Sequence, residues 1–275
     1  MRKAALVTCL LAVCALSACT TTQAGEPVSG AAAPAGSGAS SAFTDTGGLA
    51  GALKAQSDTK KTAHFTFSAS TAQGDMSGQG EMRMGTEFAM NMTMTVPGAG
   101  EVTMIMLPDA AYMKLPQSLG VQPGKPWIKI STDGSDQLSK VYGAMIKSIQ
   151  EESDITKSIE KLKDAGSITK SAKEQLDGTD VTHYWITVDL AKSAAAQTDP
   201  TMKAAIQKAI DSGTKTTSFE IWVNKDNLPV KFVAQMPTPA GGTQAVTETF
   251  TDWGKAVNIT APPADQIMQM PKLGG

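Results

Sequence analysis

The sequence has 275 residues, with 24 Lys or Arg against 26 Asp or Glu, so its formal net charge is −2. This length is enough for a sizeable hydrophobic core in one large domain or two small ones. No basic patch stands out, which argues against nucleic-acid binding, and no segment after the N-terminal region is apolar enough to span a membrane.

The N-terminus has the pattern of a secretory signal that ends at a cysteine. Arg2 and Lys3 form a basic start, residues 4–15 are apolar, and Leu16-Ser17-Ala18-Cys19 follows. The apolar run is shorter than the ~20 residues that a membrane span needs. The tetrapeptide resembles the lipobox of bacterial lipoproteins, which implies cleavage before Cys19 and attachment of a diacylglyceryl group to its thiol. The alternative is ordinary secretory cleavage with Cys19 incidental.

The remaining cysteines agree with this interpretation, because Cys9 and Cys14 both lie inside the signal. The mature chain would then have no disulfide framework, no thiolate metal site and no catalytic cysteine. Residues 20–41 are rich in Thr, Ala, Gly, Ser and Pro, which is typical of a flexible tether. We therefore expect a signal peptide (1–18), an acylated cysteine with its tether (19–43) and a single domain (44–275).

The domain is predicted to begin with a short helix around Leu49, Ala50 and Leu53, which starts near Asp45 or Thr46. Residues 64–70 follow as the first strand. Between residues 76 and 107 methionines then alternate with other residues at a period of two, which predicts three consecutive strands with one shared apolar face. The in-phase residues are Met82, Met84, Phe88, Met90, Met92, Met94, Val96, Val102, Met104 and Met106.

This methionine-rich face has two interpretations. Met is long, unbranched and adaptable, so it suits a surface that accepts a guest of variable shape. Cores are more often built from Leu, Ile and Val. The first interpretation is an apolar ligand cavity, and the alternative is a face that only packs against a covering helix.

The rest of the chain alternates between strand-like and helical patterns. Further strands are predicted at residues 110–115, 127–130, 167–176, 181–190, 219–223, 230–236 and 245–253. Asp177-Gly178 predicts a hairpin turn. Helices are predicted at 138–149 with Ser135 as N-cap, from Asp154 to Gly166, and from Asp199-Pro200 to Gly213. This order favours an α+β fold: a curved antiparallel sheet with helices over one face and an apolar cavity between the two layers.

Three local patterns carry a family resemblance. They are residues 219–223 with 226–231, residues 111–115 with 127–130, and residues 250–259 with Pro262-Pro263. In this order, and behind the lipobox, they resemble the LolA-like superfamily, and more closely the LppX/LprG-type cell-envelope lipoproteins of actinobacteria. The resemblance implies a half-barrel sheet with helices covering its concave face, and a cavity that binds acyl chains of lipids or glycolipids. It brings no catalytic residues and no cofactor, and the density of Met departs from it and leaves the ligand's identity open.

The leading hypothesis is therefore a lipid-anchored protein on the extracytoplasmic face of the cell membrane, with Cys19 as its anchor. The predicted cavity residues are Phe65, Phe67, Met82, Met84, Met90, Met92, Met94, Met104, Met106, Tyr142 and Met145. A helical lid would add Leu138, Val141, Ile146 and Ile149.

Other chemistry has weaker support. The two histidines, His64 and His183, lie on strands that do not obviously meet, and HExxH, P-loop and GxSxG patterns are absent from the sequence. Ser-x-x-Lys occurs at residues 158–161 and 167–170 without its companion motifs. We therefore expect neither an enzyme nor a metal site. Two alternatives stay open: a closed-core interaction module of the envelope, and a Cu(I) carrier that uses the Met-x-Met repeats.

Overall fold

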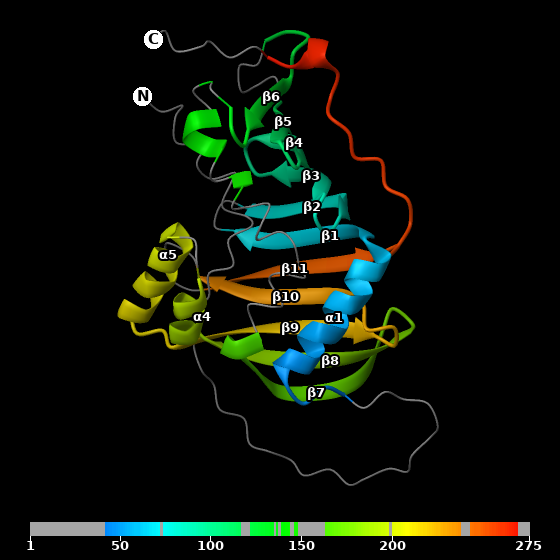
Figure 1. The fold of residues 1–275 in the computed structure, drawn as a ribbon, viewed down its shortest axis with the longest axis vertical. Helices are drawn as coiled ribbons and strands as arrows, with labels where there is room; N and C mark the ends of the chain where they lie inside the picture. The colour runs from blue at the N-terminus through cyan, green and yellow to red at the C-terminus, as the bar shows by residue number, and fades with distance from the viewer. Residues whose placement is uncertain are drawn as a thin grey trace.

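The structure is a computed structural model (Figure 1). It describes residues 42–71, 74–116, 122–134, 136, 139–143, 146–147, 163–197, 200–237 and 243–268. The predicted signal peptide, residues 19–41 of the predicted tether and nearly all of the helix predicted from Asp154 lie outside these ranges. Among the helices described, none is both long enough and apolar enough to cross a membrane.

The described strands form one sheet of eleven in the order β6-β5-β4-β3-β2-β1-β11-β10-β9-β8-β7. Every neighbouring pair is antiparallel. The sheet thus consists of two meanders, joined where β1 pairs with β11, and it ends at β6 and β7 without closing. The predicted α+β class with an antiparallel half-barrel sheet is confirmed. The strands are β1 (Thr62–Thr71), β2 (Gly74–Arg83), β3 (Ala89–Val96), β4 (Gly100–Leu107), β5 (Ala110–Lys114), β6 (Trp127–Ser131), β7 (Gly166–Leu176), β8 (Thr179–Asp189), β9 (Thr216–Asn224), β10 (Pro229–Pro237) and β11 (Thr243–Thr251).

Helix α1 (Thr46–Lys60) crosses one face of β7–β11 (Figure 1). Asp45 is its N-cap, as predicted, and its carboxylate accepts a hydrogen bond from the Gly48 N–H at 2.7 Å. Leu49, Ala50 and Leu53 are buried in a cluster with side chains of β8, β9 and β10. We call the face of the sheet beneath α1 the inner face and the opposite one the outer face.

Three further helical segments are described, of which one was predicted from the sequence and two were not. Helix α4 (Leu190–Ala196) was not predicted, because Leu190 continues the alternation of β8; Asp189 begins this helix by accepting a hydrogen bond from the Lys192 N–H at 3.0 Å. Helix α5 (Pro200–Asp211) begins at the predicted proline. A short 3-10 helix, η3 (Ala264–Gln266), lies near the C-terminus.

The helical segment after β6 packs on the inner face at the other half of the sheet. The predicted N-cap Ser135 and the predicted lid residues Leu138 and Ile149 lie outside the described residues. The Asp136 carboxylate accepts a hydrogen bond from the Ser139 N–H at 3.0 Å, as an N-cap does. Ile146 is fully buried and Tyr142 packs beside it, but Val141 is 61% exposed. Including Val141 in the lid was therefore wrong, because the residues four apart, Tyr142 and Ile146, form the face that contacts the sheet.

The C-terminal segment after β11 covers part of the outer face. Ile259, with Val257 and Ile267, packs in a cluster with Tyr112 of β5 and Trp127 of β6. Ile267 also bridges to Trp127, whose carbonyl accepts a hydrogen bond from the Met268 N–H at 2.7 Å. The segment therefore pairs with the edge strand β6 at Trp127, where an exposed backbone group would otherwise be open to pairing with another chain.

Two glycines of β2 shape the inner face. Gly80 pairs with Phe65, and Gly78 with Phe67, across the β1–β2 ladder. A Cβ atom at Gly80 would lie 2.7 Å from Phe65 Cζ and 2.3 Å from the carbonyl oxygen of Asn91. The rings of β1 thus lie over positions that only glycine can occupy without displacing a backbone atom.

The substitution Gly80→Ala should therefore destabilise the fold by about 2 kcal/mol or more, in the range of core overpacking. The matched control is Gly51→Ala in α1, where an added Cβ would have no atom within 4 Å. Because alanine is the better helix former, Gly51→Ala should stabilise the protein by roughly 0.5–1 kcal/mol. Chemical denaturation of both variants measures the difference, and equal unfolding midpoints would contradict the packing described.

Candidate functional site

The methionines of β2, β3 and β4 form continuous rows across the inner face. One row of cross-strand partners runs from Phe65 through Gly80 and Met92 to Met104 and Met113. A second row joins Phe67, Gly78, Met94 and Val102. A third row joins Ala63, Met82, Met90 and Met106. The rows arise because paired residues of an antiparallel ladder place their side chains on the same face.

The predicted cavity residues on the strands therefore lie together. All nine belong to one cluster of buried side chains, and none is more than 6% exposed: Phe65, Phe67, Met82, Met84, Met90, Met92, Met94, Met104 and Met106. Tyr142 packs against the cluster, while Met145 lies outside the described residues. Whether this face receives a ligand stays a prediction.

One charged residue on the inner face was missed in the sequence. Glu248 of β11 pairs with Phe67 of β1 on one side and with Phe232 of β10 on the other. Among the described residues its carboxyl group has no hydrogen-bond or ion-pair partner, and burial raises its pKa from the ordinary 4.5 to about 7. The signal was present, because Glu248 is in phase with Val246 and Phe250 while threonines occupy the alternate positions.

The outer face of β7, β8 and β9 carries a different constellation, centred on His183. This buried ring lies between Trp185 and Trp222, with centroid distances of 3.4 and 3.8 Å. The ammonium groups of Lys170 and Lys231 lie 4.2 and 4.6 Å from the centroids of Trp185 and Trp222, so the stack reads Lys-Trp-His-Trp-Lys.

Two carboxylates complete this stack. Nδ1 of His183 lies 2.9 Å from Glu174 Oε1, and Nε2 lies 2.8 Å from Glu220 Oε2. Both contacts are hydrogen bonds at the same time only when the ring carries two protons. The Trp222 Nε1–H also donates to Glu174, at 3.1 Å. The cluster ties three strands together through charge-assisted bonds.

The geometry of the histidines favours structural roles. The carboxylates of Glu174 and Glu220 lie on opposite sides of the His183 ring, so the three side chains do not converge on one point. The other histidine, His64, is half-exposed and lies 3.1 Å from Asp252 on the outer side of the β1–β11 junction. Among the described residues there is no group of three or more His, Cys, Asp or Glu side chains placed to hold a metal ion.

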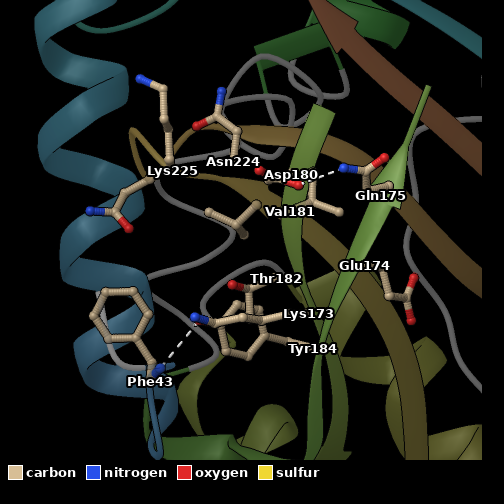
Figure 2. A pocket seen from close by; sticks show the side chains of 12 residues that line it. Phe43, Lys173, Glu174, Gln175, Asp180, Val181, Thr182, Tyr184, Asn224 and Lys225 are labelled. Carbon is tan, nitrogen blue, oxygen red and sulfur yellow. Dashed lines mark hydrogen bonds between the residues drawn. The ribbon is translucent and has the colours of Figure 1, made fainter. Parts of the chain in front are cut away.

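A pocket of about 520 Å³ lies where the hairpin between β7 and β8 meets the end of β9, beside Phe43, which precedes α1 (Figure 2). The Phe43 N–H donates to the Tyr184 hydroxyl at 3.2 Å, and Gln175 donates to Asp180 at 2.9 Å. Lysine and acidic side chains line the pocket together with Val181 and Val223. Its mixed charges distinguish it from the methionine face.

These features define an α+β domain with an open antiparallel sheet, whose inner face is lined by methionine and aromatic side chains. No family model matches the chain. An uncharacterized 31.2 kDa protein of Streptomyces griseus is 27% identical over 185 residues, which are 65% of this chain and 60% of that protein. The match thus spans less than two thirds of that relative's length.

Several solved structures are similar at low sequence identity. LprF from Mycobacterium bovis is 12% identical with a TM-score of 0.46, over 80% of this chain and 99% of LprF. MucB in complex with MucA is 12% identical with a TM-score of 0.37, over 82% of this chain and 62% of MucB. A LolA superfamily protein from Nitrosomonas europaea is 9% identical with a TM-score of 0.29, over 80% and 99% of the two chains. LprF and a LolA superfamily protein are thus among the solved structures to which this chain is similar.

The Glu174 carboxylate should stabilise the fold in a pH-dependent way. Hydrogen bonds from His183 and then from Trp222 hold the pKa of Glu174 below its ordinary 4.5. Its stabilising contribution is therefore complete above pH 4.5 and is lost as the pH falls through the lowered pKa. Glu174→Gln should lower the unfolding midpoint at pH 7, and the difference from the parent should shrink at pH 3. Glu101→Gln, on an exposed outer position of β4, should have little effect at either pH; a deficit of Glu174→Gln that is equal at both pH values would contradict the assignment.

Proposed function

We propose that the chain is an extracytoplasmic lipoprotein, anchored through Cys19, that binds the acyl chains of a lipid or glycolipid on the inner face of its sheet. The observation that carries this proposal is the cluster of methionines from β2–β4 on the inner face, which also contains Phe65 and Phe67. Three neighbouring strands supply thioether side chains in register, which a core of fixed shape does not require.

The mechanism is hydrophobic sequestration. Each CH₂ group removed from water contributes about 0.8 kcal/mol, so one long acyl chain is a strong ligand for an apolar site. Methionine side chains have three rotatable bonds and can follow chains of different length and unsaturation. No catalytic group is needed for this role.

The burial of the methionines supports a second candidate. Met106 is 0% exposed and Met94 is 2% exposed, so both side chains are already buried by other atoms of the protein. Those atoms would have to move before a ligand could contact these two methionines. If they never move, the domain is a closed-core lipoprotein that acts through its outer surface, for example through the Lys-Trp-His-Trp-Lys stack.

The anchor is tested by Cys19→Ser. Without its thiol the chain cannot receive a diacylglyceryl group, so metabolic labelling with a radioactive fatty acid such as palmitate should fall to background. The matched control is Cys14→Ser, which removes a thiol from the apolar part of the signal and should leave labelling intact. Labelling that survives Cys19→Ser would refute the lipobox assignment.

The binding face is tested by native mass spectrometry of the Cys19→Ser chain from a lipid-rich bacterial host. The parent should carry an added mass that extracts into organic solvent and fragments as a lipid. Met94→Asp places a charge on the methionine face and should abolish loading, because burying an unpaired carboxylate against an acyl chain is costly. Thr95→Asp, on the exposed outer side of the same strand, should load as the parent does.

Met94→Trp guards against a folding defect, because it fills space on the inner face without burying a charge. It should reduce loading while circular dichroism remains that of the parent. If Met94→Asp and Met94→Trp retain as much lipid as the parent, the methionine face is not the site. A parent chain without added lipid, and without uptake of a fluorescent fatty acid, would favour the closed-core candidate, whereas bound copper would favour the Cu(I) carrier.

A further inference from the structure

Glu248 is the exception on an otherwise apolar surface. Its partners in the two adjacent strands are Phe67 and Phe232, and its neighbours two residues away on β11 are Val246 and Phe250. Phe67 and Phe250 belong to the buried cluster that contains the methionines of β2–β4. Phe232 packs against this cluster and also against the cluster that contains Leu49, Ala50 and Leu53 of α1. Glu248 therefore lies where the two halves of the inner core meet, and its side chain there is partly exposed rather than fully buried.

The surroundings of Glu248 supply no counter-charge. On the described inner-face positions of β1, β9, β10 and β11, no other side chain is titratable. Tyr184 lies on β8, where its hydroxyl group accepts the Phe43 N–H. The buried side of α1 contributes Leu49, Ala50, Leu53 and Ser57, and the segment after β6 contributes Tyr142 and Ile146.

A second polar group on this side of the molecule also lacks a partner. Ser57 is 0% exposed and lies on the same face of α1 as Leu53. Its hydroxyl oxygen has no hydrogen-bond partner among the described residues. Buried polar groups are nearly always paired, and each exception calls for an explanation such as a bound water molecule.

We propose that Glu248 is a ligand-binding residue, which hydrogen-bonds to an uncharged ester or hydroxyl oxygen of the bound lipid. This inference rests on the proposed lipid-binding function and specifies its ligand class: an acyl ester such as an acylglycerol, rather than a bare hydrocarbon or a cationic amphiphile. A protonated carboxyl group offers one donor and one acceptor, which match an ester carbonyl and a hydroxyl group.

An uncharged ligand fits this position better than a cation. Burial favours the uncharged form of the carboxyl group, since the pKa of Glu248 lies near 7. A cationic headgroup would require two ions to be desolvated between phenylalanine side chains, and their attraction often fails to offset that cost. A hydrogen bond between uncharged groups avoids this penalty and leaves the methionines free to contact the acyl chain.

The test uses two pyrene probes with the same ten-carbon chain, presented to the full Cys19→Ser chain from phosphatidylcholine vesicles. One probe is the glycerol ester of pyrenedecanoic acid, and the other is decylpyrene, which has no polar group. At pH 5.5 the ratio of the affinity for the ester to the affinity for decylpyrene should be about tenfold higher for the parent than for Glu248→Leu, as expected for one hydrogen bond to the ligand. At pH 8.5, where the carboxylate no longer donates, this preference should fall several-fold.

Two variants separate the role of the carboxyl group from a general effect on folding. Glu248→Gln keeps a donor and an acceptor at every pH, so it should retain the preference for the ester at both pH 5.5 and pH 8.5. Glu248→Leu should lose the preference at both pH values while still binding decylpyrene at least as well as the parent.

The outcomes distinguish this inference from the proposed function. If the parent and Glu248→Leu show the same preference for the ester, or if the preference of the parent rises with pH, the role of Glu248 is refuted while lipid binding stands. If the parent takes up neither probe, both proposals are refuted.

Discussion

The pairing of β1 with β11 is the interaction on which the rest of the structure depends. Six residue pairs, from His64–Thr251 to Ala69–Val246, join the two meanders into one sheet. Contacts beyond the ladder extend the junction, because the Thr62 hydroxyl donates to the Lys255 carbonyl at 2.7 Å and the Gly254 N–H donates to the Thr62 carbonyl at 2.9 Å. This pairing also brings Phe67 beside Glu248, so the methionine half and the α1 half of the inner face share a boundary.

The two faces of the sheet are stabilised by different kinds of contact. The inner face is lined mainly by apolar side chains, whose packing depends little on direction. It also needs glycine at positions 78 and 80 to accommodate the rings of β1. The outer face uses directional contacts instead. Thr66 and Thr249 pair their hydroxyl groups at 2.5 Å, and the stack around His183 links β7, β8, β9 and β10. Both faces thus constrain the register of the strands, the outer face through polar contacts and the inner face through the fit of the β1 rings over glycine.

Much of the fold was predictable from the sequence, because strand alternation is a local property. The in-phase methionines, the Asp177-Gly178 hairpin and the cap at Asp45 all follow from a few neighbouring residues. Contacts between distant strands were not predictable, since alternation does not identify the partner of a strand; the approach of Trp222 to His183 is one example. Helix α4 was hidden because Leu190 continued the preceding period, and Val141 was misplaced because its position also fits a wider helical stripe. Glu248 was in phase with apolar residues, but a charged residue in a strand is ordinarily expected to face solvent.

The junction of β1 and β11 also constrains how the chain can fold. Its contacts join residues as far apart as 193 positions, between Thr62 and Lys255. The first meander can assemble from local hairpins, yet its β1 edge remains unpaired until the final strand has been synthesised. Non-local strand pairing is slow, and an unpaired edge next to exposed methionines is prone to aggregation. The edge of β1 therefore stays open to pairing with another chain until β11 adds to it.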